Sequence, residues 1–103
     1  MSWKQIFGKY NQNITESKKL HSNYEFTLNP TGQQIRVNVW ENNNGTFTGY
    51  TNYSIQSPQQ AAPYRSIYPQ NTPEEALDDA IGGILNYYEE PYNQIKFIPE
   101  QYY

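Results

Sequence analysis

Two turn signals divide residues 23–55 into three segments in which apolar and polar residues alternate. The first is Asn29-Pro30-Thr31-Gly32, where proline fixes one φ angle and glycine accepts a positive one. The second is Asn44-Gly45, a pair typical of type I′ turns in β-hairpins. Alternation with a period of two indicates strands with one buried face. The sequence therefore predicts a three-stranded antiparallel meander.

The alternation also assigns residues to the two faces of each predicted strand. In the first strand the apolar face holds Tyr24, Phe26 and Leu28. In the second strand Ile35, Val37 and Val39 lie opposite Arg36, Asn38 and Trp40. "TFTGYTNYSI" predicts one continuous third strand, with Phe47, Gly49, Thr51, Tyr53 and Ile55 on one face and Thr48, Tyr50, Asn52 and Ser54 on the other. The apolar run Ile95, Phe97 and Ile98 can add a fourth short strand.

The clearest helix signal follows the long, proline-containing connection at residues 56–71. Thr72 is a suitable N-cap, Pro73 occupies the first helical position, and Glu75 completes a capping box. Pro91 requires the helix to end by Glu90. The apolar side, which we expect to pack on the sheet, holds Leu77, Ile81, Ile84, Leu85 and Tyr88.

A shorter helix is predicted near the N-terminus, where Ser2 can cap a segment that carries Trp3, Ile6, Phe7 and Tyr10 at helical spacings. Residues 13–23 are compatible with either a second helical turn or a polar connection. At 103 residues the chain has room for one modest core. We therefore expect a single α+β domain over residues 1–103, with the long helix packed on one face of the meander.

Two adjacent glycines, Gly82 and Gly83, lie on the polar side of the predicted long helix. They project with Glu75, Asp79, Asn86 and Glu90, although each glycine costs about 1 kcal/mol relative to alanine in a helix interior. One interpretation is that the helix merely tolerates them and another part of the chain lies nearby. The other is that they leave a flat, acidic surface on which a second molecule can come close.

Charge is distributed unevenly along the chain. Residues 71–103 hold seven Asp and Glu but only Lys96, whereas residues 1–70 hold six Lys and Arg and three Glu. Such asymmetry can steer a charged partner, and it is also compatible with an ordinary solvated helix. A homodimer that forms through the same face is a further alternative, although it would bring like charges together.

Catalysis and metal binding find little support in the composition. The chain has one histidine, His21, and no cysteine, and it contains no glycine-flanked serine nucleophile, phosphate loop or metal-ligand spacing. We expect a protein that is not an enzyme and that uses no cofactor or metal. The segment "MSWKQIFGKY" has no apolar signal region, and no stretch approaches a membrane span, so the expected compartment is the cytoplasm.

Tyrosine and arginine in the long connection suggest a second binding element. Tyr64, Arg65 and Tyr68 are residue types that often dominate protein interfaces. Together with Tyr50 they could instead stack the bases of single-stranded nucleic acid. Seven Lys and Arg spread over the chain form no evident basic stripe, and phosphate contacts normally dominate such binding. We therefore favour a protein partner with a basic surface.

The β-β-β-α order over residues 23–88, ending in "TPEEALDDAIGGILNYYEE", resembles HicB-like antitoxin domains, in which a meander precedes a helix with a similar capped start. This resemblance implies a small inhibitor or regulator of the antitoxin kind, and immunity proteins and phage anti-defence proteins have the same acidic character. The order is also similar to that of double-stranded-RNA-binding domains. Those proteins carry lysines at the start of the last helix, where this chain has Glu74 and Glu75.

Overall fold

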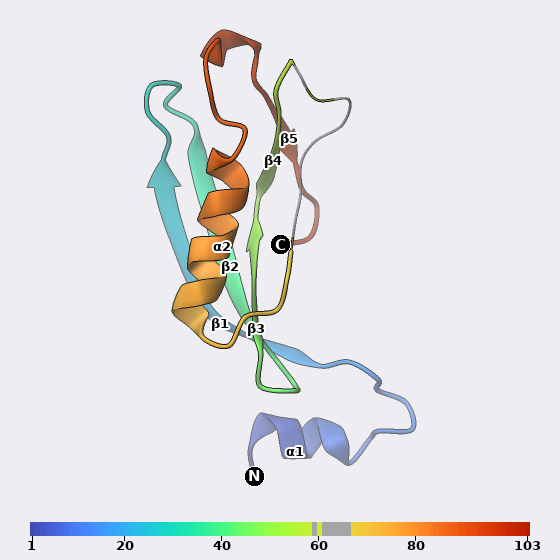
Figure 1. The fold of residues 1–103 in the computed structure, drawn as a ribbon. Helices are drawn as coiled ribbons and strands as arrows, with labels where there is room; N and C mark the ends of the chain where they lie inside the picture. Colours follow the sequence, from blue (N-terminus) through green and yellow to red (C-terminus); the bar gives the residue numbers. More distant parts are fainter. Residues whose placement is uncertain (59, 61–66) are drawn as a thin grey trace.

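The computed structural model describes residues 1–58, 60 and 67–103. The fold is α+β and combines a three-stranded antiparallel sheet, a two-stranded sheet, one helix of 13 residues and a short N-terminal helix (Figure 1). In chain order the elements are α1 (Trp3–Gly8), β1 (Lys18–Thr27), β2 (Gln34–Asn42), β3 (Phe47–Thr51), β4 (Tyr53–Gln56), α2 (Pro73–Leu85), the 3₁₀ turn η1 (Tyr92–Gln94) and β5 (Lys96–Pro99).

The predicted meander is confirmed as the sheet β1-β2-β3. Its first turn contains Gly32 with a φ of 78°, and the amide of Leu28 donates to the carbonyl of Gln33 at 2.8 Å. β1 begins at Lys18, five residues before the predicted start, and a bulge at His21 shifts its register with β2. Residues 13–23, which were compatible with either a helical turn or a polar connection, are thus strand from Lys18 onward.

The second turn differs from the predicted type I′ geometry. That type requires a positive φ at both central residues, but only Gly45 has one, at 87°, among the described residues of the turn. The loop is one residue longer, because the amide of Asn42 donates to the carbonyl of Thr46 at 2.8 Å. Asn44 keeps an ordinary backbone and its Oδ1 accepts from the amide and hydroxyl of Thr46 at 3.1 and 2.6 Å.

The predicted third strand is wrong as a single element, because it divides at Asn52 into β3 and β4. Asn52 Oδ1 accepts from the Arg36 amide at 2.8 Å, and the Asn52 carbonyl accepts from the Glu100 amide, also at 2.8 Å. The chain therefore leaves β2 at this residue and pairs with the tail. β4 and β5 form the second sheet, with Ile55 opposite Phe97, so the fourth strand expected from the tail is confirmed.

The start of α2 is confirmed at its N-cap and at Pro73, with Thr72 Oγ1 accepting from the Glu75 amide at 3.1 Å. The Glu75 half of the predicted capping box differs, because its carboxylate accepts from the Thr72 hydroxyl at 3.0 Å. The helix ends at Leu85, earlier than the limit at Glu90. The chain then turns toward the sheet, and the Tyr88 hydroxyl lies 2.9 Å from the hydroxyl of Thr31 in the β1–β2 turn. This link fixes the segment after the helix to the meander.

The packed side of α2 differs from the predicted one. Ile84 is buried and Leu77 and Tyr88 pack against the core, but Leu85 is 48% exposed. The helix is rotated toward its small residues, so that Ala76 and Ala80 are buried against the sheet. The cause is Gly49 on β3, because a Cβ there would lie 2.4 Å from the carbonyl oxygen of Ala76. The core beneath holds Ile35, Val37, Val39 and Ile55, each at most 1% exposed.

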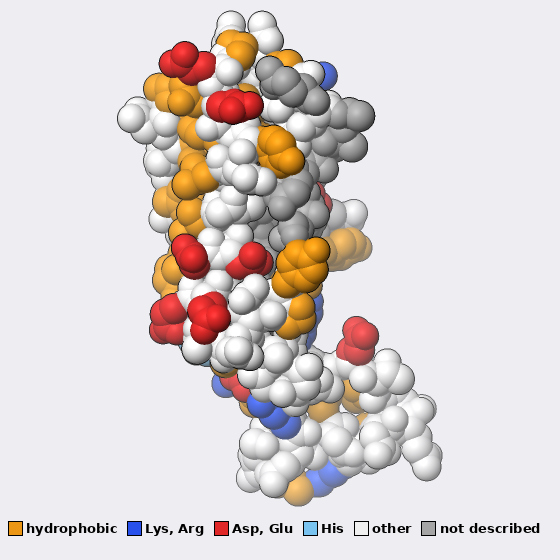
Figure 2. Space-filling model, in the orientation of Figure 1, with side chains coloured by type: hydrophobic (Ala, Val, Ile, Leu, Met, Phe, Trp, Pro, Cys, Tyr) orange, Lys and Arg blue, Asp and Glu red, His pale blue; other side chains and the backbone are white. Residues whose placement is uncertain are grey.

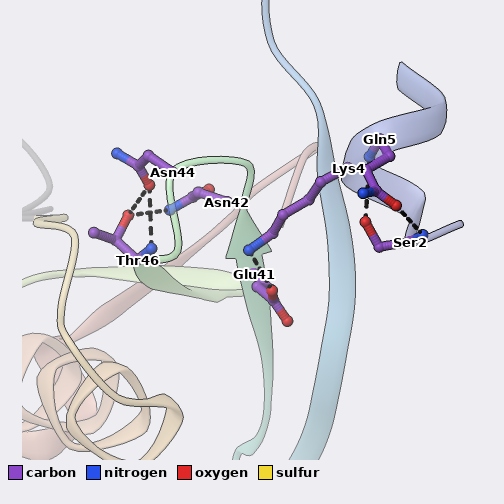
Figure 3. A network of polar contacts seen from close by, with 7 residues as sticks. All are labelled: Ser2, Lys4, Gln5, Glu41, Asn42, Asn44 and Thr46. Atoms are coloured by element: carbon purple, nitrogen blue, oxygen red, sulfur yellow. Dashed lines mark hydrogen bonds and ion pairs between the residues drawn. The ribbon is translucent and has the colours of Figure 1, made fainter. Parts of the chain in front are cut away.

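The predicted N-terminal helix is confirmed, with Ser2 as its N-cap and with a capping box to Gln5 that was not predicted, but it does not join the core. All of its residues are half-buried or exposed, and Ile6 and Phe7 are 46% and 39% exposed. Among the described residues we find a single polar link from α1 to the sheets, from Lys4 Nζ to Glu41 Oε2 at 2.9 Å (Figure 3). α1 thus stands apart from α2 and the sheets (Figure 1).

Candidate functional site

The first candidate surface is the polar side of α2 and the segment after it, which we call the acidic helix face. It consists of the predicted residues Glu75, Asp79, Gly82, Gly83, Asn86 and Glu90. Residues 72–90 hold six carboxylates and no Lys or Arg. Figure 2 shows acidic side chains over the start of α2 and others beyond its end, with a stretch between them that has few charged groups.

The two glycines lie open within this stretch. Gly82 is exposed and Gly83 half-buried, and a Cβ built on either would have no described atom within 4 Å beyond the local helix backbone and chain neighbours. They are therefore not required for the packing of α2 on the described part of the molecule. The approach of helix to sheet depends instead on Gly49.

The carboxylates around the glycines differ in their surroundings. Glu75 is exposed, and its Oε1 lies 3.0 Å from the Thr72 hydroxyl, which donates to it. Asp79 is half-buried, and its Oδ2 is buried without a hydrogen-bond partner among the residues that the structure describes. Glu90 is exposed and lies beyond the end of the helix. The carboxylates of this face are thus divided between the first half of α2 and a separate group after its end.

The remaining predicted residues contribute unequally. Asn86 is the exposed C-cap of α2, and its amide donates to the carbonyl of Gly82 at 2.9 Å. Tyr68 is 64% exposed, so its ring is accessible beside the connection. The predicted anchors Tyr64 and Arg65 lie outside the described residues.

A second candidate surface, of which the sequence indicated only Tyr50, lies on the opposite face of the three-stranded sheet. Lys18 Nζ lies 4.6 Å from the centroid of the Trp40 ring and 5.2 Å from that of Tyr50. Trp40 and Tyr50 share this face because Asn38, two residues from Trp40, pairs with Tyr50. We call this arrangement the lysine–aromatic cleft; its volume is about 710 Å³, and Glu100, Gln101, Tyr102 and Tyr103 complete its lining.

The C-terminal tail is held across this face by several polar contacts. Asn38 Nδ2 donates to the Tyr103 carbonyl at 3.0 Å, and the hydroxyl of Ser54 donates to the Glu100 carboxylate. Nearby, hydrogen bonding to Tyr103, followed by the negative charge of Glu25 on the neighbouring strand, raises the pKa of Arg36 above its usual value. The Trp40 indole N–H is buried with no hydrogen-bond partner in the described parts of the chain.

The alternation of β2 and β3 places Trp40 and Tyr50 on polar strand faces, and this signal was available in the sequence. Lys18 was missed because the predicted first strand began at residue 23, whereas β1 begins at Lys18. The tail was missed because its contacts join residues far apart in the sequence. Within the residues described, no three or more His, Cys, Asp and Glu side chains gather as metal ligands, and no helix is long and apolar enough to cross a membrane.

Comparisons with protein-family models, with curated proteins and with solved structures found no match. The function is therefore inferred from the geometry of the two surfaces.

Proposed function

We propose that this protein is a non-catalytic binding module that acts as an inhibitor or regulator of another protein, by covering a basic surface of that partner with its acidic helix face. The observation that carries the proposal is the open surface at Gly82 and Gly83, bordered by carboxylates. In the described residues no Lys or Arg forms an ion pair with a carboxylate of residues 72–90. Small antitoxins, immunity proteins and phage anti-defence proteins act in this way.

Charge and access have separate roles in this proposal. The carboxylates attract a basic surface over a distance and raise the rate of encounter. The absence of side chains at the two glycines lets the partner's backbone or an aromatic ring reach the helix backbone. Tyr68, which is largely exposed and precedes α2 in the sequence, is the further aromatic residue that we expect to contact the partner.

The test is capture of partners from native lysate by the immobilised full chain and by two variants. Gly83→Arg places a bulky cation on the open surface, and Glu90→Lys reverses a charge beside it. We expect both variants to lose the captured protein and the wild-type interaction to weaken as salt rises. Glu16→Lys, a reversal at an exposed residue outside this face, is the matched control and should retain the partner. Retention by Gly83→Arg would refute the proposal.

The lysine–aromatic cleft favours a second candidate, the binding of single-stranded nucleic acid. An ammonium group beside two aromatic rings combines the charge and the stacking surface that such ligands use. Electrophoretic mobility shifts with a short oligonucleotide at two salt concentrations, and retention on heparin, test this candidate. Binding that weakens with salt and is lost in Lys18→Gln would favour it over the protein-partner proposal.

A further inference from the structure

The N-terminal arm, residues 1–15, projects from the rest of the fold, and its helix does not join the core. It exposes large apolar side chains, with Ile6, Phe7 and Tyr10 at 46%, 39% and 57% exposure. Trp3 and Phe7 contact each other edge to face, with ring centroids 6.2 Å apart. A cluster of exposed aromatic and aliphatic side chains on a projecting segment is typical of an interaction site.

The dimensions of the molecule show how far the arm projects. The radius of gyration is 15.9 Å and the longest extent is 52 Å, against 24 and 20 Å in the other two directions. A compact chain of this length has a radius of gyration of about 13 Å. Figure 1 shows α1 beyond the end of the sheets and away from α2.

The charge of the arm is opposite to that of the acidic helix face. Residues 1–15 contain Lys4 and Lys9 and no Asp or Glu, whereas residues 72–90 contain six carboxylates and no Lys or Arg. Lys4 is paired with Glu41 on β2 (Figure 3). Lys9 is exposed and has no ion-pair partner in the described parts of the chain. An aromatic, basic segment and a flat, acidic surface are thus present on the same chain, and they do not contact each other.

We infer that the arm of one molecule docks on the acidic helix face of a second copy of this chain, with the rings of Phe7 and Tyr10 over Gly82 and Gly83 and Lys9 beside the carboxylates. The contact joins two different surfaces, so it avoids the repulsion that two acidic faces would meet. If both arms exchange, the result is a closed dimer; if each arm binds the next molecule, the result is an open chain. The inference goes beyond the proposed function, because here the occupant is the protein itself.

A test follows from the two-sided nature of the contact. Phe7→Asp disables the arm and leaves the helix face intact, whereas Gly83→Arg disables the face and leaves the arm intact. Sedimentation velocity of the purified full chain over a range of concentrations should show wild-type self-association. We expect each variant alone to lose it, with the dissociation constant raised at least about tenfold.

Mixing the two variants is the decisive step. An equimolar mixture retains one intact arm and one intact face, so it should form a one-to-one dimer although each variant alone is monomeric. This complementation also shows that both variants are folded. Thr27→Arg, the same added charge on an exposed residue of β1 outside both the arm and the acidic helix face, is the control and should associate like the wild type.

Two results would overturn the inference: a wild-type chain that is monomeric at all concentrations, or self-association that both variants retain. Its failure is distinguishable from failure of the proposed function. A monomeric wild-type chain that still captures a partner, and loses it in Gly83→Arg, would leave the proposed function intact.

Discussion

α2 faces a glycine on its packed side and carries two glycines on its open side, and a side chain would have opposite effects at the two places. At Gly49 an added Cβ would meet the helix backbone at 2.4 Å, whereas at Gly82 and Gly83 it would meet no described atom within 4 Å. Glycine is therefore required by the architecture on the packed side. On the open side it lowers helix stability without serving the packing that the structure describes.

The largest expected effect is that of Gly49→Ala. The new methyl group would collide with the carbonyl oxygen of Ala76 and lie 3.0 Å from the Cβ of Ala80, so the helix must move away from β3. Overpacking typically costs 1–3 kcal/mol, and a backbone atom yields less easily than a side chain. We expect the free energy of unfolding, measured by urea denaturation, to fall by about 3 kcal/mol.

Gly8→Ala is the matched control for this change, because a Cβ on Gly8 would have no described atom within 4 Å. It should unfold at the same urea concentration as the wild type or a higher one. Equal midpoints for Gly49→Ala and the wild type would show that helix and sheet are not in close contact, and the contrast between the two sides would disappear.

The same contact explains what could be predicted from the sequence and what could not. Alternation and turn residues located the meander, and Thr72 and Pro73 located the start of α2, because these signals depend on neighbouring residues. The packed side of the helix was assigned from its large apolar residues. The true packed side depends on Ala76 and Ala80 meeting a glycine on another element, and local periodicity does not report such a pairing.

The division of the third strand at Asn52 was unpredictable for a related reason. Its hydrogen bonds reach Arg36 on β2 and Glu100 in the tail, and the residues between them form most of the chain. The lysine–aromatic cleft likewise requires β1, β2, β3 and the tail to meet. By contrast, the placement of Gly82 and Gly83 on the polar side of the helix could be read from the helix's own residues, whereas the sequence left open whether another part of the chain covers them; no described atom does so.

An effect of opposite sign is expected at the open glycines. Replacing glycine by alanine in a helix raises the free energy of unfolding by about 0.5–1 kcal/mol, because alanine restricts the unfolded chain and here meets no described atom. Gly82→Ala and Gly83→Ala should each raise the free energy of unfolding by that amount, measured by urea denaturation beside Gly49→Ala. A loss of stability in either variant would mean that the surface is covered.

The smallest expected change in the free energy of unfolding comes from neutralising one carboxylate on the open side of α2. Glu74 and Asp78 are both exposed and four residues apart on α2, where like charges repel by a few tenths of a kcal/mol. Asp78→Asn should therefore raise the free energy of unfolding by about 0.2–0.5 kcal/mol at low ionic strength. The gain should shrink as salt screens the wild-type repulsion. A gain in stability that is independent of salt would point to a local structural cause. Repulsion between the carboxylates on this side would then have no measurable effect on the free energy of unfolding.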